Sequence, residues 1–250
     1  MISAVQQPLE SMTYTAIGPA RDRRLLERLI AAQATFRALS RQELAETVTH
    51  SQIMEVRRGA AIVRRGERMP GLIVLGSGSA KLSLRRRNGE ENVLRLLDPG
   101  NTFGLAATVL DRPSPVDLLA LSPCLAAVVP PLQVKKLLES NATFARALTR
   151  ALAERFLELV GELESSVQHS SAQRLACYLL SLAAPGGNGA ACVSRLPATK
   201  TTVAARLGVK KETLSRLLHA LAERRLIEVR GRDIALLDRP RLLQVAERGF

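Results

Sequence analysis

Cysteine is scarce in this chain of 250 residues, which contains three cysteines. Cys124, Cys177 and Cys192 lie far apart, and none belongs to a Cys-x-x-Cys pair. This spacing argues against a disulfide framework and against a zinc knuckle. Because free cysteine usually packs as a small apolar residue, we expect all three to be structural.

Long apolar runs and catalytic motifs are also missing. No apolar run approaches the about 20 residues of a membrane span, and Met1 to Ala20 has no basic segment ahead of an apolar stretch. We therefore expect a cytoplasmic protein with no membrane partner.

The sequence contains no P-loop, no His-Glu-x-x-His motif and no nucleophile–His–acid arrangement. An enzyme with a regulatory β domain is thus disfavoured; we predict no catalytic residues and no metal-binding cluster.

Acidic residues are outnumbered by basic ones, 23 against 36, which gives a net charge of +13. The excess is largest at the end of the chain, where residues 170–250 carry a net charge of +8. A basic balance of this size indicates a polyanionic partner, with nucleic acid the first candidate. A generally arginine-rich proteome would give the same composition, so composition alone leaves both explanations open.

Between His50 and Pro130, short apolar stretches alternate with glycine. The stretches have the length of strands, about 4–8 residues. They are Ala61–Val63, Leu72–Leu75, Ala80–Leu84, Val93–Leu97 and Leu118–Val129. Asn88-Gly89 is typical of a hairpin turn between two of them. Many short strands with regular turns predict a small antiparallel barrel or sandwich.

Helical patterns flank this region on both sides. Met1 to about Ala20 is unpatterned and predicts a loose arm, whereas Arg21–Leu39 has apolar residues at helical spacing. Ser40 followed by Glu43 predicts a capping box and a helix to about Thr49. Pro130-Pro131 ends the strands, and we expect a short helix to Glu139.

A longer helix is predicted from an Asn141 cap to His169. Its apolar residues recur at spacings of three and four and form one stripe. They are Leu148, Leu152, Phe156, Leu159, Leu163 and Val167. A helix of this length needs a surface to bury the stripe, and a second copy of the chain provides one. Packing on its own β domain is the alternative. We assign Leu148, Leu152, Phe156, Leu159 and Leu163 to a homodimer interface.

The residues after the long helix predict a helix-turn-helix. Ser170 or Ser171 caps one helix that runs through Ala183, and Pro185–Gly189 is a loop. A short helix then starts at Thr199 and ends at Gly208, a residue that tolerates a positive φ. A second helix follows from Lys211 to about Glu223, with leucines on its inner side.

The outer side of this second helix suits the major groove of DNA. Glu212, Ser215 and Arg216 share one face near its N-terminus. Arg216 can donate two hydrogen bonds to guanine, and Glu212 can accept one from cytosine. We predict that these three residues read bases. The alternative for Glu212 is an exposed ion pair with Arg216, worth about 0.3–0.5 kcal/mol.

Further residues are placed to contact phosphate. Thr199, Lys200 and Thr201 begin a helix, where backbone N–H groups bind anions. Lys210 and Lys211 begin the next helix. The segment Leu226–Leu236 predicts a hairpin, or wing, with Arg230 and Arg232 at its tip. Such contacts add affinity and salt dependence but little sequence choice.

These features resemble the CRP/FNR superfamily of bacterial transcription regulators over about residues 30–240. The run Glu212-Thr213-Leu214-Ser215-Arg216 is similar to that family's recognition helix, and glycines at 59, 66, 76, 89, 100 and 104 match its β-roll turns. The resemblance implies an α+β fold. Its domains would be an N-terminal arm (1–29), an antiparallel β-roll like a cyclic-nucleotide-binding jelly roll (30–140), a dimerisation helix (141–169) and a winged helix-turn-helix (170–250).

Departures from the family pattern bear on the effector. The family's cyclic-AMP cassette has Gly-Glu-Leu and a later Arg-Ser pair; here the matching residues are Gly104-Leu105-Ala106 and Pro115-Val116. Without the carboxylate and the arginine, we do not expect cyclic AMP to bind. An FNR-type iron–sulfur cluster needs four cysteine ligands, mostly near the N-terminus, and no cysteine precedes Cys124. Residues 101–112 contain neither cysteine nor histidine, unlike the carbon-monoxide-sensing branch.

Ser215 makes the chain similar to the FNR and DNR (NnrR-like) branch. That branch implies a dimer on TTGAT-type half-sites, contact with RNA polymerase, and a response to nitric oxide, other nitrogen oxides or low oxygen in denitrification. Some members of that branch are proposed to sense nitric oxide through haem, which makes haem a candidate cofactor here, with His50 or His169 as its ligand. A surface or capping role is the favoured interpretation of each histidine. Lys210 replaces the usual Ser or Thr cap of the recognition helix. A protein that binds DNA without sequence preference is a further alternative, as is the same fold with another effector.

Overall fold

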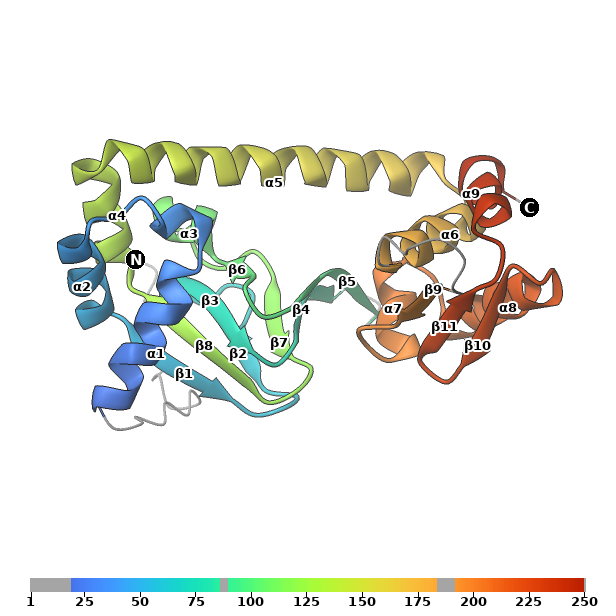
Figure 1. Cartoon of the computed structure of the whole chain (residues 1–250), viewed down its shortest axis with the longest axis horizontal. Helices are drawn as coiled ribbons and strands as arrows, with labels where there is room; N and C mark the ends of the chain where they lie inside the picture. Colours follow the sequence, from blue (N-terminus) through green and yellow to red (C-terminus); the bar gives the residue numbers. More distant parts are fainter. Residues whose placement is uncertain (1–18, 86–89, 184–191, 250) are drawn as a thin grey trace, which may run out of the picture. The chain divides into compact units, whose positions relative to one another are not determined.

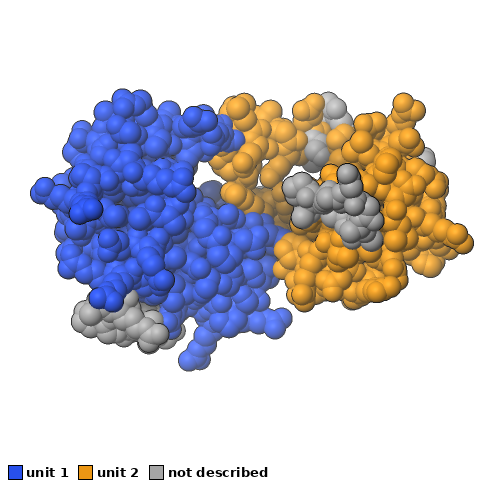
Figure 2. All heavy atoms as spheres, viewed as in Figure 1, with its two compact units in different colours: residues 1–83, 96–154 blue, residues 84–95, 155–250 orange. Residues whose placement is uncertain are grey.

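A computed structural model of the chain describes residues 19–85, 90–183 and 192–249, which form two compact units (Figures 1 and 2). The first unit comprises Met1–Ser83 and Leu96–Glu154, and the second comprises Leu84–Arg95 and Arg155–Phe250. The predicted arm up to residue 18, the Asn88-Gly89 turn and the Pro185–Gly189 loop lie outside the described residues.

The β domain is built from two antiparallel sheets (Figure 1), and residues 84–95 of the second sheet belong to the second unit. One sheet has the order β1-β8-β3-β6 and the other the order β2-β7-β4-β5. The strands are β1 (Gln52–Val56), β2 (Ala61–Val63), β3 (Leu72–Ser77), β4 (Ala80–Arg85), β5 (Glu91–Leu97), β6 (Thr102–Phe103), β7 (Asp117–Ala120) and β8 (Cys124–Val129). The predicted β-roll is thereby confirmed.

Strands β3 and β8 are buried on both faces, because their alternate side chains point to opposite sides of the sheet. Ile73 and Val128 enter the core between the two sheets. Val74 and Val129, their neighbours in sequence, enter a second core beneath helices. This explains why β3 and β8 read as continuous apolar runs rather than as alternating ones.

Helices cover the outer face of the β1-β8-β3 sheet. They are α1 (Pro19–Ala31), the 3-10 turn η1 (Ala34–Phe36), α2 (Arg41–His50), α4 (Pro131–Ser140) and the start of α5 (Ala142–Gln168). The predicted capping box of α2 is present, with Ser40 and Glu43 bonded in both directions. Phe36 and Phe144 are fully buried where these helices meet, with ring centroids 5.3 Å apart.

Some elements of this unit differ from the prediction. The stretch Leu118–Val129 forms two strands rather than one, because the chain turns at Ser122 and Pro123, and proline cannot donate a ladder hydrogen bond. The prediction missed β1, β6 and the short helix α3 (Leu105–Val109). Strand β1 mixes polar and apolar residues, and the other two are too short to show a period.

The second unit contains the winged helix-turn-helix. Its elements are α6 (Ser171–Leu182), β9 (Cys192–Arg195), α7 (Lys200–Arg206), α8 (Lys211–Glu223), β10 (Ile227–Arg230), β11 (Asp233–Leu236) and α9 (Arg239–Arg248). The predicted Ser170 cap and the predicted hairpin are confirmed. Strand β9 adds to the hairpin beside β11, and it was not predicted.

Candidate nucleic-acid interface

The helix-turn-helix consists of α7 and α8, joined at Gly208. The Thr199 side chain caps α7 by accepting a hydrogen bond from the backbone N–H of Thr202, at 3.3 Å. Gly208 has a φ of 65°, which a residue with a Cβ adopts only with strain. Leu214, Leu218 and Leu221 of α8 are buried in one core with Val203 and Ala204 of α7. The shared core fixes the two helices to each other.

The polar face of α8 is open to solvent within its unit. Glu212, Ser215 and Arg216 are all exposed. Among the described residues no ion pair within 4.0 Å joins Glu212 to Arg216; instead the Arg216 Nη2 lies 3.5 Å from the Thr213 hydroxyl. The alternative explanation of Glu212, a local pair with Arg216, therefore does not describe this conformation. Both side chains are available to another molecule.

The predicted phosphate-binding residues lie at the N-termini of the same two helices. Thr201, Lys210 and Lys211 are exposed, and Lys200 is half-buried. Lys210 occupies the N-cap position of α8 and makes no side-chain cap. Its ammonium is therefore not used in fixing the helix and is placed beside the anion-attracting N-terminus.

The two arginines of the wing have different surroundings. Arg230, at the end of β10, pairs with Glu228 at 2.9 Å and is 77% exposed. Arg232 donates two hydrogen bonds, of 3.0 and 2.6 Å, to the Leu196 carbonyl. The prediction for Arg232 is corrected here: its guanidinium holds the wing to the loop before α7. Arg230 keeps the predicted position at the surface.

Helix α5 carries an exposed apolar seam. At about 100° per residue, residues spaced alternately by four and three stay on one face. Five exposed residues follow that spacing: Thr149, Ala153, Phe156, Val160 and Leu163. Phe156 and Leu163 are each 65% exposed, and Val160 is 46% exposed. Such a heptad seam is the pattern that packs against a second helix in a coiled coil.

The predicted dimer stripe is therefore corrected at its N-terminal end. Leu148 is 2% exposed and belongs to the core between helices and sheet of its own chain, against which Leu152 also packs. The alternative, packing on the β domain, holds for these two residues. Leu159 is 47% exposed but lies to one side of the seam. Leu148, Leu152 and Leu159 each lie one residue before a residue of the exposed seam, whereas the predicted residues Phe156 and Leu163 belong to it.

A small cavity lies in the interior of the β domain. That cavity, between residues such as Ile73, Leu97 and Phe103, has a volume of about 10 Å³, which is about the room of one water molecule. Leu105 begins α3 where the cyclic-AMP cassette would have a carboxylate, and Pro115 and Val116 stand where it would have its arginine and serine. These side chains do not provide the charge pair that a cyclic nucleotide needs.

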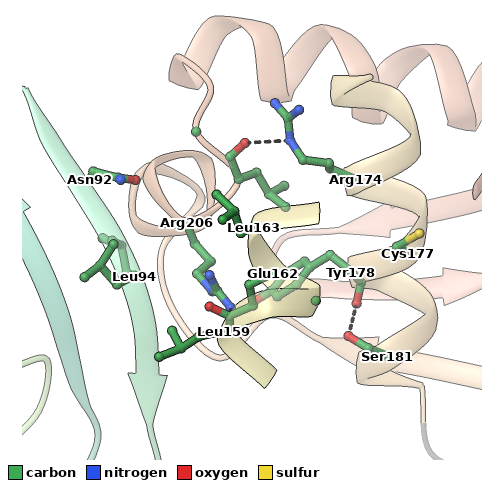
Figure 3. A pocket seen from close by; sticks show the side chains of 14 residues that line it. Asn92, Leu94, Leu159, Glu162, Leu163, Arg174, Cys177, Tyr178, Ser181 and Arg206 are labelled. Carbon is green, nitrogen blue, oxygen red and sulfur yellow. Dashed lines mark hydrogen bonds and ion pairs between the residues drawn. The ribbon is translucent and has the colours of Figure 1, made fainter. Parts of the chain in front are cut away.

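A larger cavity, of about 860 Å³, lies within the second unit (Figure 3). It is lined by residues from β5, α5, α6 and α7, among them Leu94, Glu162, Arg174, Tyr178 and Arg206. Arg174 donates hydrogen bonds to the carbonyls of Leu207 and His169, so it joins the ends of α7 and α5.

The cysteines behave as expected where they are described. Burial raises the pKa of the Cys124 thiol and of the Cys177 thiol, so both stay protonated at neutral pH. A protonated thiol is a poor nucleophile and a poor metal ligand. The side chain of Cys192 is outside the described residues.

The two histidines predicted as haem ligands lie at the ends of helices in different units. His50 is exposed at the end of α2, and its Nδ1 lies 2.9 Å from the Glu46 carbonyl oxygen. His169 follows α5, with its carbonyl bonded to Arg174, and neither histidine lines a cavity described above. These surroundings suit a surface or capping role, and haem ligation by either histidine stays a prediction. Among the described residues, no group of three His, Cys, Asp or Glu residues could hold a metal ion.

Sequence comparisons agree with this architecture. The profile of the Crp-like helix-turn-helix domain matches residues 173–245, and that of the cyclic nucleotide-binding domain matches residues 53–141. Together the two profiles cover well over half of the chain. Among the described residues, no helix is long and apolar enough to cross a membrane.

The relatives are transcription regulators rather than enzymes. The chain is 23% identical to the CRP-like cAMP-activated global transcriptional regulator of Mycobacterium tuberculosis, over 88% of this chain and 100% of the relative. It is 25% identical to the global nitrogen regulator of Synechococcus elongatus, over 79% and 90%. The structure of FixK2 from Bradyrhizobium japonicum has the same fold, with a TM-score of 0.68 at 20% identity over 78% of this chain and 96% of that one. The chain belongs to the CRP/FNR family of DNA-binding transcription regulators.

Proposed function

We propose that the protein is a homodimer that binds a palindromic operator of TTGAT-type half-sites and regulates transcription through RNA polymerase. The exposed face of α8, with Glu212, Ser215 and Arg216, is the observation that carries this proposal. Arginine pairs with guanine in the major groove, and glutamate accepts from cytosine. Family members bind DNA and act as dimers. The exposed seam of α5 supplies the surface for such a dimer here.

The test is binding to a duplex with two such half-sites, spaced by one helical turn of about 34 Å, at about 0.15 M salt with random DNA as competitor. Binding that survives the competitor supports a sequence-specific regulator. Equal binding to operator and scrambled duplexes would instead identify a protein that binds DNA without sequence preference. No binding to either duplex would remove the proposed operator.

For the effector, we propose a molecule other than cyclic AMP, with nitric oxide or another nitrogen oxide as the first candidate. Leu105 and Val116 support an effector other than cyclic AMP, because neither side chain offers the polar contacts that a cyclic nucleotide needs. The choice of a nitrogen oxide as the first candidate rests on the resemblance of the recognition helix to that of the DNR branch. Addition of cyclic AMP should leave the affinity for the operator unchanged, and addition of nitric oxide should alter it.

The binding of haem is tested by absorption spectroscopy. His50 is exposed and its Nδ1 lies 2.9 Å from the Glu46 carbonyl oxygen, so we expect protein purified without oxygen and mixed with haem to show no Soret band that shifts with nitric oxide. A His50→Ala variant that abolished such a band would contradict this expectation. The response of operator binding to nitric oxide is measured in the same samples, so that the effector and the cofactor are tested separately.

A further inference from the structure

One carboxylate connects the dimerisation helix to the helix-turn-helix. The Glu162 Oε1, on α5, lies 3.0 Å from the Arg206 Nη2, on α7, and 3.6 Å from the Arg155 Nη1. The side chains are only 33%, 27% and 27% exposed. By contrast, the pair Arg150–Glu154 on the same helix is 82% and 60% exposed. The Glu162 pair is therefore less screened by water and salt than an ordinary surface pair.

A third element faces the same carboxylate. Arg95, on β5, is half-buried, and its pKa is lowered by burial and by the charges of Arg155 and Arg206, while Glu158 and Glu162 oppose this shift. Three guanidinium groups thus share two carboxylates. Removing the charge of Glu162 would leave like charges from β5, α5 and α7 facing one another.

Apolar packing does not replace this connection. The core of the helix-turn-helix draws its buried and half-buried apolar residues from α6 to α9, and among the described residues it includes none from α5. Leu159 and Leu163, the two leucines of α5 that line the same cavity as Glu162, are 47% and 65% exposed. The helix-turn-helix is therefore one body that is fastened to α5 by polar contacts.

We propose that Glu162 is a positioning residue, whose ion pair with Arg206 fixes the helix-turn-helix on the dimerisation helix and so sets the spacing of half-sites that the dimer accepts. Because α7 and α8 share a core, an anchor on α7 also anchors the recognition helix. The inference rests on the proposed function, since spacing has a meaning only for a dimer on a palindrome. It assigns to Glu162 and Arg206 a role in choosing the operator without any contact with DNA.

The experiment compares duplexes whose two half-sites are one or two base pairs closer or farther apart than in the preferred operator. For Glu162→Gln we expect the preference for the best spacing to fall roughly threefold to tenfold, because a half-exposed pair is lost in both subunits. Affinity for a single half-site should not change. Arg206→Gln should have the same effect, and the double variant should be no worse than either single one, since both remove one interaction.

Glu154→Gln is the matched control, because it breaks the 2.8 Å pair with Arg150 on the same helix without reaching α7. It should keep the wild-type spacing preference, and Arg206→Lys should keep most of it by retaining a positive charge. A wild-type preference retained in Glu162→Gln, or lost equally in Glu154→Gln, overturns the inference. Wild-type protein that binds no palindrome removes the proposed operator instead.

A second measurement does not need DNA. Spin labels on Leu157→Cys and His219→Cys, both in the second unit, in a chain whose three native cysteines are replaced by alanine, report the distance from α5 to α8. Wild-type protein should give one narrow distance distribution, and Glu162→Gln should broaden it. An unchanged width in Glu162→Gln would overturn the positioning role even if operator binding failed for another reason.

Discussion

Arg216 should read sequence, whereas other exposed cations of the same domain should not. Replacing it with alanine removes a bidentate donor to guanine and should weaken operator binding by about 1–3 kcal/mol. Preference at one base position of each half-site should relax at the same time. Fluorescence anisotropy on operator variants with each base changed in turn measures both effects.

The matched control for Arg216 is Arg239→Ala, which removes an exposed cation of the same domain from α9. It should leave the base preferences as they are. If Arg216→Ala bound cognate and scrambled duplexes with wild-type affinities, Arg216 would not be a base reader.

Thr108 offers a different prediction, about stability. Its Oγ1 is buried with no hydrogen-bond partner among the described residues, and the residue is 1% exposed. A buried hydroxyl without a partner costs about 1–3 kcal/mol. Thr108→Val, which keeps the shape and removes the polar atom, should therefore raise the free energy of unfolding by about 1 kcal/mol, as measured by urea denaturation.

Thr47→Val is the control for that substitution. Thr47 is equally buried, but its hydroxyl donates to the Glu43 carbonyl at 2.7 Å and accepts from the Gln133 amide at 3.1 Å. The same substitution there should lower the free energy of unfolding by about 1–2 kcal/mol, because it leaves a buried amide unpaired. Two threonines that responded alike would contradict this account.

The residues of the recognition helix were predictable because their pattern is local. Leu214 and Leu218 follow the helical period, so the exposed positions of Glu212, Ser215 and Arg216 follow as well. The role of Arg232 was not predictable, because its partner is the carbonyl of Leu196, 36 residues away. The same holds for Glu162 and Arg206, which lie 44 residues apart in sequence.

At the scale of elements, the long helix shows what periodicity leaves open. Spacings of three and four predict that one side of α5 is apolar, but Leu148 and Phe156 satisfy the pattern equally well. Only the structure shows that Leu148 packs against its own chain and that Phe156 is 65% exposed. Short strands such as β6 and β9 were missed for a related reason: too few residues were present to establish an alternation.

The corrected seam makes a prediction about assembly. Val160→Asp places a charge in the middle of the exposed face of α5, flanked by Phe156 and Leu163. A charge buried in a coiled-coil seam costs several kcal/mol, so the variant should be monomeric at micromolar concentrations where the wild type is a dimer. Analytical ultracentrifugation measures the change.

Leu132→Asp is the control for general effects of removing an exposed apolar residue. Leu132 is 80% exposed in the first turn of α4, where an aspartate is also favoured by the helix dipole. That variant should remain dimeric. If Val160→Asp also remained dimeric at all concentrations, the seam would not be the dimer interface.

At the scale of the whole molecule, the net charge of +13 has a measurable consequence. The cations predicted to face phosphate are Lys200, Lys210, Lys211 and Arg230 in each subunit. If all of them contact phosphate in both subunits, the logarithm of operator affinity should fall against the logarithm of salt concentration with a slope of about −7. Filter binding between about 0.05 and 0.2 M salt measures that slope.

Lys211→Ala separates this electrostatic contribution from base reading. It removes one phosphate contact in each subunit, so the slope should become shallower by about 2. Affinity for operator and scrambled duplexes should fall by the same factor, unlike the selective loss expected for Arg216→Ala. Lys135→Ala, which removes a cation that lies 3.6 Å from Asp111 in the other unit, should leave the slope unchanged. A slope that changed equally in both variants would show that the net charge, rather than the placement of cations at the N-terminus of α8, governs the affinity for DNA.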